Sequence, residues 1–196
     1  MICYLVRHGR DDESVRGGWN GQSLTEEGVQ QAKRLAEYVR ENRDALDIRR
    51  LYTSDLPRAR QTAEPVAQVL DMPLTKMPDF REVNNGALAG MDNELAKQKY
   101  PGLFWSTLEW GKCYPGGESP KQFCERISHA WEEFTRSAAE ANGNVMLVTH
   151  SGVIHVILCL LEGRPYTNKE KHRRIPHAQP IAIEFSDGVW REKNDT

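Results

Sequence analysis

The sequence lacks paired cysteines, a long apolar run and an excess of basic charge. None of its four cysteines forms a CxxC pair, which argues against a zinc knuckle or a thioredoxin-like motif. The longest apolar stretch, residues 153–161, is interrupted by His155 and is far too short to span a bilayer. Lys and Arg total 26 against 28 Asp and Glu. A formal net charge of -2 therefore gives no indication of a nucleic-acid partner or of an anionic membrane surface.

Composition is typical of an ordinary globular protein, with 39% hydrophobic and 28% charged residues. Cys3 and Cys159 lie inside apolar runs and are predicted to be small buried hydrophobic residues. Unpaired cysteines favour a reducing compartment, so we expect the cytoplasm. The apolar run at residues 1–6 is too short, and lacks the basic residues, for a signal peptide. No repeat, low-complexity segment or linker divides the 196 residues, so a single domain is predicted over 1–196.

Short apolar runs alternate with amphipathic helical patterns along the chain. Strands are predicted near residues 2–6, 50–53, 74–77 and 145–149, and a hairpin near 181–191. Helices are predicted to start near Thr25, Pro57, Pro120 and Val153. Pro65 should kink or divide the second of these helices. The alternation predicts an α/β fold, a three-layer αβα sandwich with a mostly parallel central sheet.

Residues 83–117 are rich in glycine and aromatic side chains and fit neither pattern. We expect an irregular, partly helical excursion there. Its aromatic part, residues 104–114, is interpreted either as a lid over an active site or as a small core of its own. Farther on, Lys169, Lys171, Arg173 and Arg174 form a basic run. It is interpreted as a solvated loop, which would favour an anionic substrate if it lay over the mouth of the site.

Polar side chains follow three of the predicted strands. Arg7 and His8 come after the first, Arg58 lies beyond the second, and His150 with Ser151 follows the strand at 145–149. In open α/β sheets, ligands bind at the carboxyl ends of the strands. Guanidinium groups and helix N-termini both favour phosphate. The sequence therefore predicts a phosphate site at this edge of the sheet.

Each of these groups also has an ordinary structural interpretation. An Arg-His pair at a strand end is often a solvated edge, and a lone histidine is often structural. Arg58 is the most informative cation, because the helix dipole disfavours a positive charge in a first helical turn. An anion near Arg58 would offset this repulsion.

Six blocks of sequence, in order, resemble the motifs of a known family. They are Leu5–Gly9, Ser23–Gly28, Tyr52–Ala59, Phe80–Glu82, Gly116–Ser119 and Val148–Gly152. The family is the histidine phosphatase superfamily, in its phosphoglycerate-mutase-like branch 1. The similarity extends over most of residues 2–163.

The resemblance implies a catalytic set of five residues. His8 would be the nucleophile, Arg7, Arg58 and His150 would bind the phosphate, and Glu82 would be the general acid and later the base. A neutral imidazole attacks phosphorus without a metal or other cofactor, and covalent catalysis divides one difficult displacement into two. The arginines and a protonated His150 would stabilise the transition state. A partly dry pocket would help Glu82 to hold its proton.

The sequence departs from the family pattern in the first loop and near the C-terminus. Arg10, Asp11, Ser14 and His177 stand where the family often has other residues. Possible substrate contacts are Arg10, Ser14, Gly18, Trp19 and Ser151, with packing as the favoured interpretation of Trp19.

The favoured function is a metal-independent phosphomonoesterase that hydrolyses a small phosphorylated metabolite through a phosphohistidine. A phosphoglycerate mutase is the alternative, disfavoured because family mutases tend to be longer. A non-catalytic phospho-ligand-binding module is disfavoured because His8 and Glu82 are both present. A histidine metal site lacks partner ligands at suitable spacing. We expect no nucleic-acid or membrane partner. The sequence is compatible with a monomer and with a homodimer, since the predicted hairpin could pair across subunits.

Overall fold

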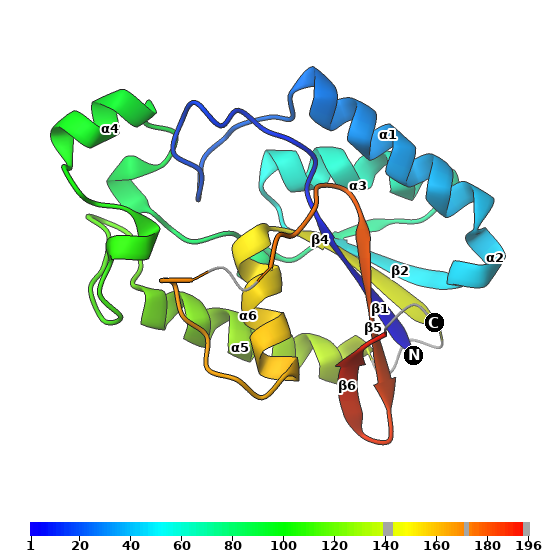
Figure 1. Cartoon of the computed structure of the whole chain (residues 1–196). Coiled ribbons are helices and arrows are strands. Elements are labelled where there is room, and N and C mark those ends of the chain that lie inside the picture. Colours follow the sequence, from blue (N-terminus) through cyan, green and yellow to red (C-terminus); the bar gives the residue numbers. More distant parts are fainter. Residues whose placement is uncertain (139–142, 171–172, 194–196) are drawn as a thin grey trace.

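A six-stranded sheet forms the centre of the protein (Figure 1). The computed structural model describes residues 1–138, 143–170 and 173–193. The strands are β1 (Ile2–Arg7), β2 (Ile48–Thr53), β3 (Leu74–Lys76), β4 (Asn144–Thr149), β5 (Pro180–Ser186) and β6 (Val189–Glu192). Their order is β3-β2-β4-β1-β5-β6. The first four strands in this order run parallel to one another, whereas β5 is antiparallel to β1 and β6 is antiparallel to β5, which confirms the mostly parallel sheet.

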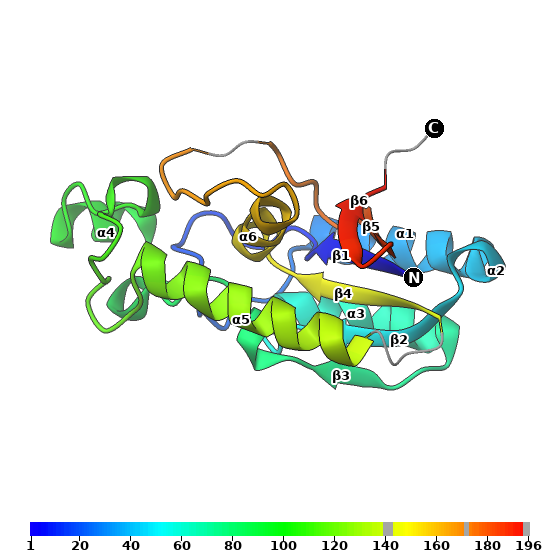
Figure 2. The ribbon, with the colours of Figure 1, turned by 90° about the horizontal axis from the view of Figure 1, so that it is seen from below.

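Helices cover both faces of this sheet. They are α1 (Glu26–Glu41), α2 (Arg43–Leu46), α3 (Pro57–Leu70), α4 (Asn93–Lys99), α5 (Pro120–Ala138) and α6 (Ser151–Leu161), with short 3₁₀ turns at Pro78–Phe80, Gly86–Leu88 and Trp105–Thr107. Figure 2 shows α5 and α6 on one face and α1 and α3 on the other.

The side chains of β1 alternate between two clusters of buried residues, one on each face of the sheet. Cys3 and Leu5 pack in one buried cluster with residues of α5 and α6. Tyr4 and Val6 point to the other face, into a cluster with residues of α1 and α3. Successive side chains of a strand point to opposite faces, so a wholly apolar strand fits a sheet that is covered on both sides. The predicted three-layer αβα sandwich is confirmed.

Local sequence signals set several element boundaries. Thr25 caps α1, because its hydroxyl accepts a hydrogen bond from the Gly28 amide at 3.1 Å. At the start of α5, Ser119 and Gln122 each accept a hydrogen bond from the other's amide. The predicted division of the second helix is wrong, since α3 continues through Pro65. Burial of the flanking helix face in the core offsets the one backbone hydrogen bond that proline removes.

The segment at residues 83–117 contains α4 and two of the short 3₁₀ turns. It lies at the end of the molecule where β1 and β4 terminate (Figures 1 and 2). Leu88, Leu108 and Tyr114 form a small core inside it. The predictions for Cys3 and Cys159 are confirmed, since both are buried. Within the described ranges, no helix combines the length and apolar character needed to cross a membrane.

Candidate active site

The strand order brings the predicted cations to one edge of the sheet. β4 lies between β1 and β2, and all three are parallel. Hydrogen bonds continue past the strand ends, because the His8 amide donates to the Thr149 carbonyl at 2.9 Å. The imidazole rings of His8 and His150 are consequently only 5.1 Å apart between centroids.

His8 is a buried imidazole with a defined tautomer. Its Nδ1 lies 2.7 Å from the Gly9 carbonyl oxygen, which can only accept, so Nδ1 carries the proton. Its Nε2 accepts from Nε of Arg58 at 3.3 Å. Burial, and next the charge of Arg58, lower the pKa of His8 well below the usual value. The ring is therefore neutral near pH 7, with the lone pair on Nε2.

Arg58 is held in the first turn of α3 by contacts to the first loop. Its Nη1 donates to Oδ1 of Asn20 at 2.8 Å, and its Nη2 donates to the Gly18 carbonyl at 2.8 Å. Its side chain is 2% exposed, and Oδ2 of Asp11 lies 3.4 Å from its Nε. The anion expected near Arg58 is thus supplied in part by the protein itself. Asn20 could not be predicted as a partner of Arg58, because no spacing signal in the sequence connects the two residues.

His150 is fully buried behind this pair. Its Nε2 lies 2.8 Å from Oγ of Ser54, while Nδ1 has no hydrogen-bond partner among the described residues. Burial and the nearby charge of Arg58 lower the pKa of His150 well below the usual value. The protonated His150 expected from the sequence is therefore not favoured by the protein's own groups. A phosphate dianion beside it would favour the charged form.

Glu82 lies at the N-terminus of α6. Its Oε2 accepts from the Gly152 amide at 3.0 Å, and its Oε1 accepts from the Val83 amide at 3.1 Å. A Cβ at position 152 would lie 2.3 Å from Oε1, so only glycine leaves room for the carboxylate. The backbone carbonyl of Glu82 accepts from the indole of Trp19 and from Arg126. One of the helix N-termini expected to attract phosphate is thus occupied by Glu82.

His177 joins the site from the segment before β5. Its Nδ1 donates to the His8 carbonyl at 2.8 Å, and the two rings are 5.7 Å apart between centroids. Arg7 is anchored nearby, with Nη1 donating to the Ile175 carbonyl at 3.0 Å. His177, which in the sequence is only a departure from the family pattern, therefore lies next to His8, the candidate nucleophile.

The suggested substrate contacts divide into two groups. Arg10 is exposed and paired with Glu27 and Glu13, at 2.9 and 3.4 Å. Ser14 is also exposed, and its carbonyl accepts from Asn93 of α4. The Arg10 guanidinium is therefore engaged with the two glutamates, and contacts of Arg10 and Ser14 with a substrate stay predictions.

The other three lie closer to the catalytic candidates. Gly18 binds Arg58 through its carbonyl, and Ser151 begins α6 next to His150. Trp19 packs against neighbouring residues, and its contact with a substrate stays a prediction. Its indole donates to the carbonyl of Glu82, and its ring packs 4.8 Å from the Arg81 guanidinium carbon.

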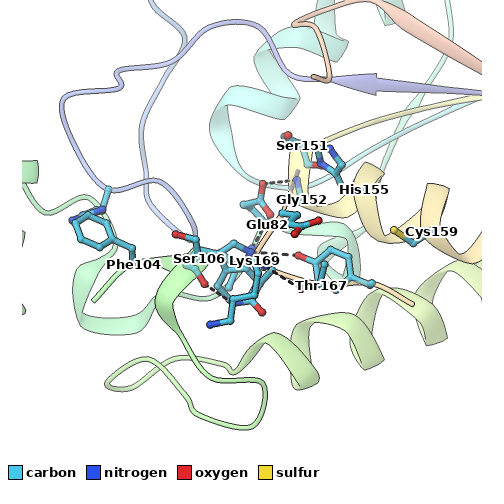
Figure 3. A pocket seen from close by; sticks show the side chains of 15 residues that line it. Glu82, Phe104, Ser106, Ser151, Gly152, His155, Cys159, Thr167 and Lys169 are labelled. Atoms are coloured by element: carbon cyan, nitrogen blue, oxygen red, sulfur yellow. Dashed lines mark hydrogen bonds between the residues drawn. The ribbon is translucent and has the colours of Figure 1, made fainter. Parts of the chain in front are cut away.

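A cavity of about 550 Å³ adjoins Glu82 and Gly152 (Figure 3). Aromatic side chains from the excursion, Phe104 and Trp105, form one wall, and Tyr166 with the segment 167–170 forms another. Leu108 and Tyr114 of the aromatic segment pack in the small core, while a role of the segment as a lid stays a prediction. Of the basic run, Lys169 lines the cavity and Arg173 pairs with Glu192, while Lys171 lies outside the described residues.

Metal ligands are not clustered in this region. Across residues 1–138, 143–170 and 173–193, no three His, Cys, Asp or Glu side chains are placed together so that they could hold a metal ion.

Comparisons with known proteins agree with this geometry. The chain is 30% identical over 196 residues to PhoE of Bacillus subtilis, named as an uncharacterized phosphatase, covering 98% of this chain and 92% of that one. A solved mycobacterial glucosyl-3-phosphoglycerate phosphatase superposes with a TM-score of 0.78 at 25% identity, covering 98% and 96%.

A mutase is also among the relatives. A 2,3-bisphosphoglycerate-dependent phosphoglycerate mutase of Parvibaculum lavamentivorans is 26% identical over 207 residues, covering 98% of this chain and 95% of the mutase. Chain length therefore does not separate a phosphatase from a mutase here. The sequence profile of the histidine phosphatase superfamily (branch 1) matches residues 3–195. This chain is therefore a member of the histidine phosphatase superfamily, branch 1.

Proposed function

We propose that this protein hydrolyses small phosphomonoesters through a phosphohistidine on His8. The observation that carries the proposal is the tautomer of His8, whose Nδ1 proton is fixed on the Gly9 carbonyl. The lone pair on Nε2, which accepts from Nε of Arg58 at 3.3 Å, is released for attack on phosphorus when Arg58 donates to the incoming phosphoryl oxygens instead. The low pKa of His8, caused by burial and Arg58, keeps this nucleophile unprotonated at neutral pH.

The first chemical step forms a bond between Nε2 of His8 and phosphorus while the bond from phosphorus to the ester oxygen breaks. Glu82, entering this step as the acid, gives its proton to the departing alcohol oxygen. Arg58 and Arg7 offset the charge that gathers on the phosphoryl oxygens. The phosphate dianion raises the pKa of His150, which then adds a third positive charge.

The second step returns the protein to its starting state. The Glu82 carboxylate takes a proton from a water molecule, and the water oxygen attacks phosphorus. The bond between phosphorus and Nε2 breaks, and inorganic phosphate leaves. Glu82 is then protonated again, and His8 is neutral.

The test is phosphate release from 4-nitrophenyl phosphate in the presence of a chelator. We expect turnover by the wild-type protein and an acid-labile phosphohistidine after rapid quenching. His8→Ala should abolish both, and Glu82→Gln should slow turnover while leaving phosphate binding in place. Full activity of His8→Ala would overturn the mechanism. Phosphate binding without any trapped intermediate would favour a non-catalytic binding module instead.

A phosphoglycerate mutase is the second candidate, because a mutase relative aligns with nearly the whole chain. A mutase must keep water from the phosphohistidine, whereas the cavity of about 550 Å³ beside Glu82 leaves room for water around a three-carbon acid. This observation favours hydrolysis. Phosphoglycerate interconversion faster than phosphate release, measured on the same protein sample, would reverse the choice.

A further inference from the structure

We infer that the alcohol released from the substrate carries a flat aromatic or apolar ring, bound in the cavity beside Glu82. This inference rests on the proposed phosphatase function and specifies its substrate class. It excludes the smallest phosphorylated metabolites, such as three-carbon acids, as the best substrates.

The position of the cavity assigns it to the leaving group. In a phosphoryl transfer, the attacking and departing atoms lie on opposite sides of phosphorus. The attacking atom is Nε2 of His8, and the departing oxygen must meet Glu82. The cavity is lined by Glu82 and Gly152, whereas His8 and Arg58 are not among its lining residues. Whatever is attached to the departing oxygen therefore extends into this cavity (Figure 3).

The size of the cavity argues for a bulky group. Its volume of about 550 Å³ lies within the range of about 300–1,000 Å³ typical of pockets for drug-sized ligands. A three-carbon acid would leave most of this volume filled by water. A ring system would displace that water from apolar walls, which is favourable.

The cavity walls are suited to a flat ring. Phe104, Trp105 and Tyr166 present aromatic surface to the cavity. The guanidinium of Arg16 lies 4.5 Å from the ring centroid of Phe104, which makes a cation–aromatic stack at the cavity wall. Aromatic surface of this kind binds rings face to face or edge to face.

The charges around the cavity do not favour a polyanionic alcohol. Lys169 lines the cavity, but its Nζ donates to the Leu108 carbonyl at 2.8 Å. Glu170 brings a negative charge to the same lining, and Arg16, which packs on Phe104, is the remaining cation there. A single cation already engaged with an aromatic ring is a weak attraction for a second phosphate or a carboxylate.

Hydrogen bonds also connect the two walls of the cavity. The side-chain amide of Asn168 donates to the carbonyls of Trp105 and Leu108, and the indole of Trp105 donates to the Tyr166 hydroxyl at 3.3 Å. These bonds connect the excursion to the segment after α6. A site that is already formed loses little conformational entropy when its ligand binds.

The experiment compares two alkyl esters whose alcohols have similar intrinsic reactivity, 2-(1-naphthyl)ethyl phosphate and ethyl phosphate. We expect kcat/KM of the wild-type protein to be at least about tenfold higher for the naphthyl ester, since a hydrophobic pocket discriminates by roughly 10–200-fold for each group it accommodates. Phe104→Ala should lower the ratio of the two kcat/KM values about tenfold. Tyr38→Ala removes an exposed aromatic ring from α1 and should leave both values unchanged.

The outcomes separate this inference from the function on which it rests. Equal kcat/KM for the two esters, with no effect of Phe104→Ala on their ratio, overturns the inference and leaves the phosphatase in place. No hydrolysis of either ester, with no phosphohistidine trapped, overturns the proposed function and this inference together. A matched melting temperature of the Phe104→Ala variant shows that a change in ratio does not come from unfolding.

Discussion

Nε of Arg58 lies 3.3 Å from Nε2 of His8, and both side chains are buried. This contact directs the proton of His8 to Nδ1 and leaves the nucleophilic lone pair beside a permanent positive charge. The same charge that keeps His8 neutral is in place to bind the incoming phosphoryl group. Arg58 is therefore both an orienting group and a phosphate ligand in the proposed mechanism.

Arg58→Lys keeps the charge but loses the fork that contacts His8, Asn20 and Gly18 together. We expect kcat to fall about 100-fold, in line with the loss of one preorganised donor in other active sites. The measurement is kcat with 4-nitrophenyl phosphate, together with the melting temperature. Arg40→Lys, on the exposed side of α1, is the matched control and should retain wild-type kcat. Wild-type kcat in Arg58→Lys would contradict the role of the fork.

Gly152→Ala places a Cβ 2.3 Å from Oε1 of Glu82 and must displace that carboxylate. Because general acid catalysis contributes about 10²–10⁴-fold, we expect kcat to fall by about 100-fold or more. Phosphate binding, measured by calorimetry, should change little. Gly21→Ala has no atom within 4 Å of the added Cβ and serves as the control. A Gly152→Ala variant with normal kcat would show that Glu82 is not the acid.

Asp11→Asn removes a carboxylate 3.4 Å from Nε of Arg58. Burial raises the pKa of Asp11, opposed by Arg58, so its charge appears at a higher pH than is usual for aspartate. As pH rises through this titration, the carboxylate increasingly repels bound phosphate. We expect the inhibition constant for phosphate to rise with pH more steeply in the wild type than in Asp11→Asn. The exposed Asp12→Asn should follow the wild-type profile, and weaker phosphate binding by Asp11→Asn would indicate that Asp11 donates a proton to phosphate instead.

Stability should fall as pH is lowered below the usual histidine range. Burial lowers the pKa values of His8, His150 and His177 in the folded chain. Below about pH 6.5 the unfolded chain binds protons that the native chain does not, so the free energy of unfolding falls by about 1.4 kcal/mol per pH unit for each such proton.

The measurement is urea unfolding at several pH values between 7 and 5. His177→Asn keeps a donor for the His8 carbonyl and removes one titrating group, so its dependence on pH should be shallower. His129→Asn, at an exposed position on α5, should follow the wild type. Identical slopes for wild type and His177→Asn would contradict a depressed pKa at position 177.

The fold could be predicted largely from local signals. The runs that became β1 and β4 are short, wholly apolar and end at polar residues, which is typical of strands covered on both faces. Several element boundaries depend on nearby atoms alone. They lie at the Thr25 cap, at the Ser119–Gln122 box, and at the turn of Asp187 and Gly188, which both have positive φ. Pro65 does not divide α3, because packing of the helix against the core outweighs the local preference of proline, and a kink there stays a prediction.

The candidate site could be predicted only where strands position it. His8 and His150 follow neighbouring parallel strands, so their meeting follows from the sheet. The contacts of Arg58 with Asn20 and Asp11 depend on how the first loop folds against α1 and α3. The same folding pairs Arg10 with Glu27 of α1 and joins Ser14 to α4. The cavity depends on the meeting of the excursion with the segment after α6. No periodicity in the sequence reports such long-range loop packing.

The position of β1 in the sheet also bears on how the chain acquires its activity. Its two neighbours, β4 and β5, both follow α5 and so lie far from β1 along the chain. A nascent chain that ends before β4 therefore carries His8 and Arg58 without His150 or the helix end that holds Glu82. In the proposed mechanism the phosphate ligands come from both of these parts of the chain, so phosphate binding would stabilise the completed fold by mass action. We therefore expect binding of inorganic phosphate to report the completion of folding.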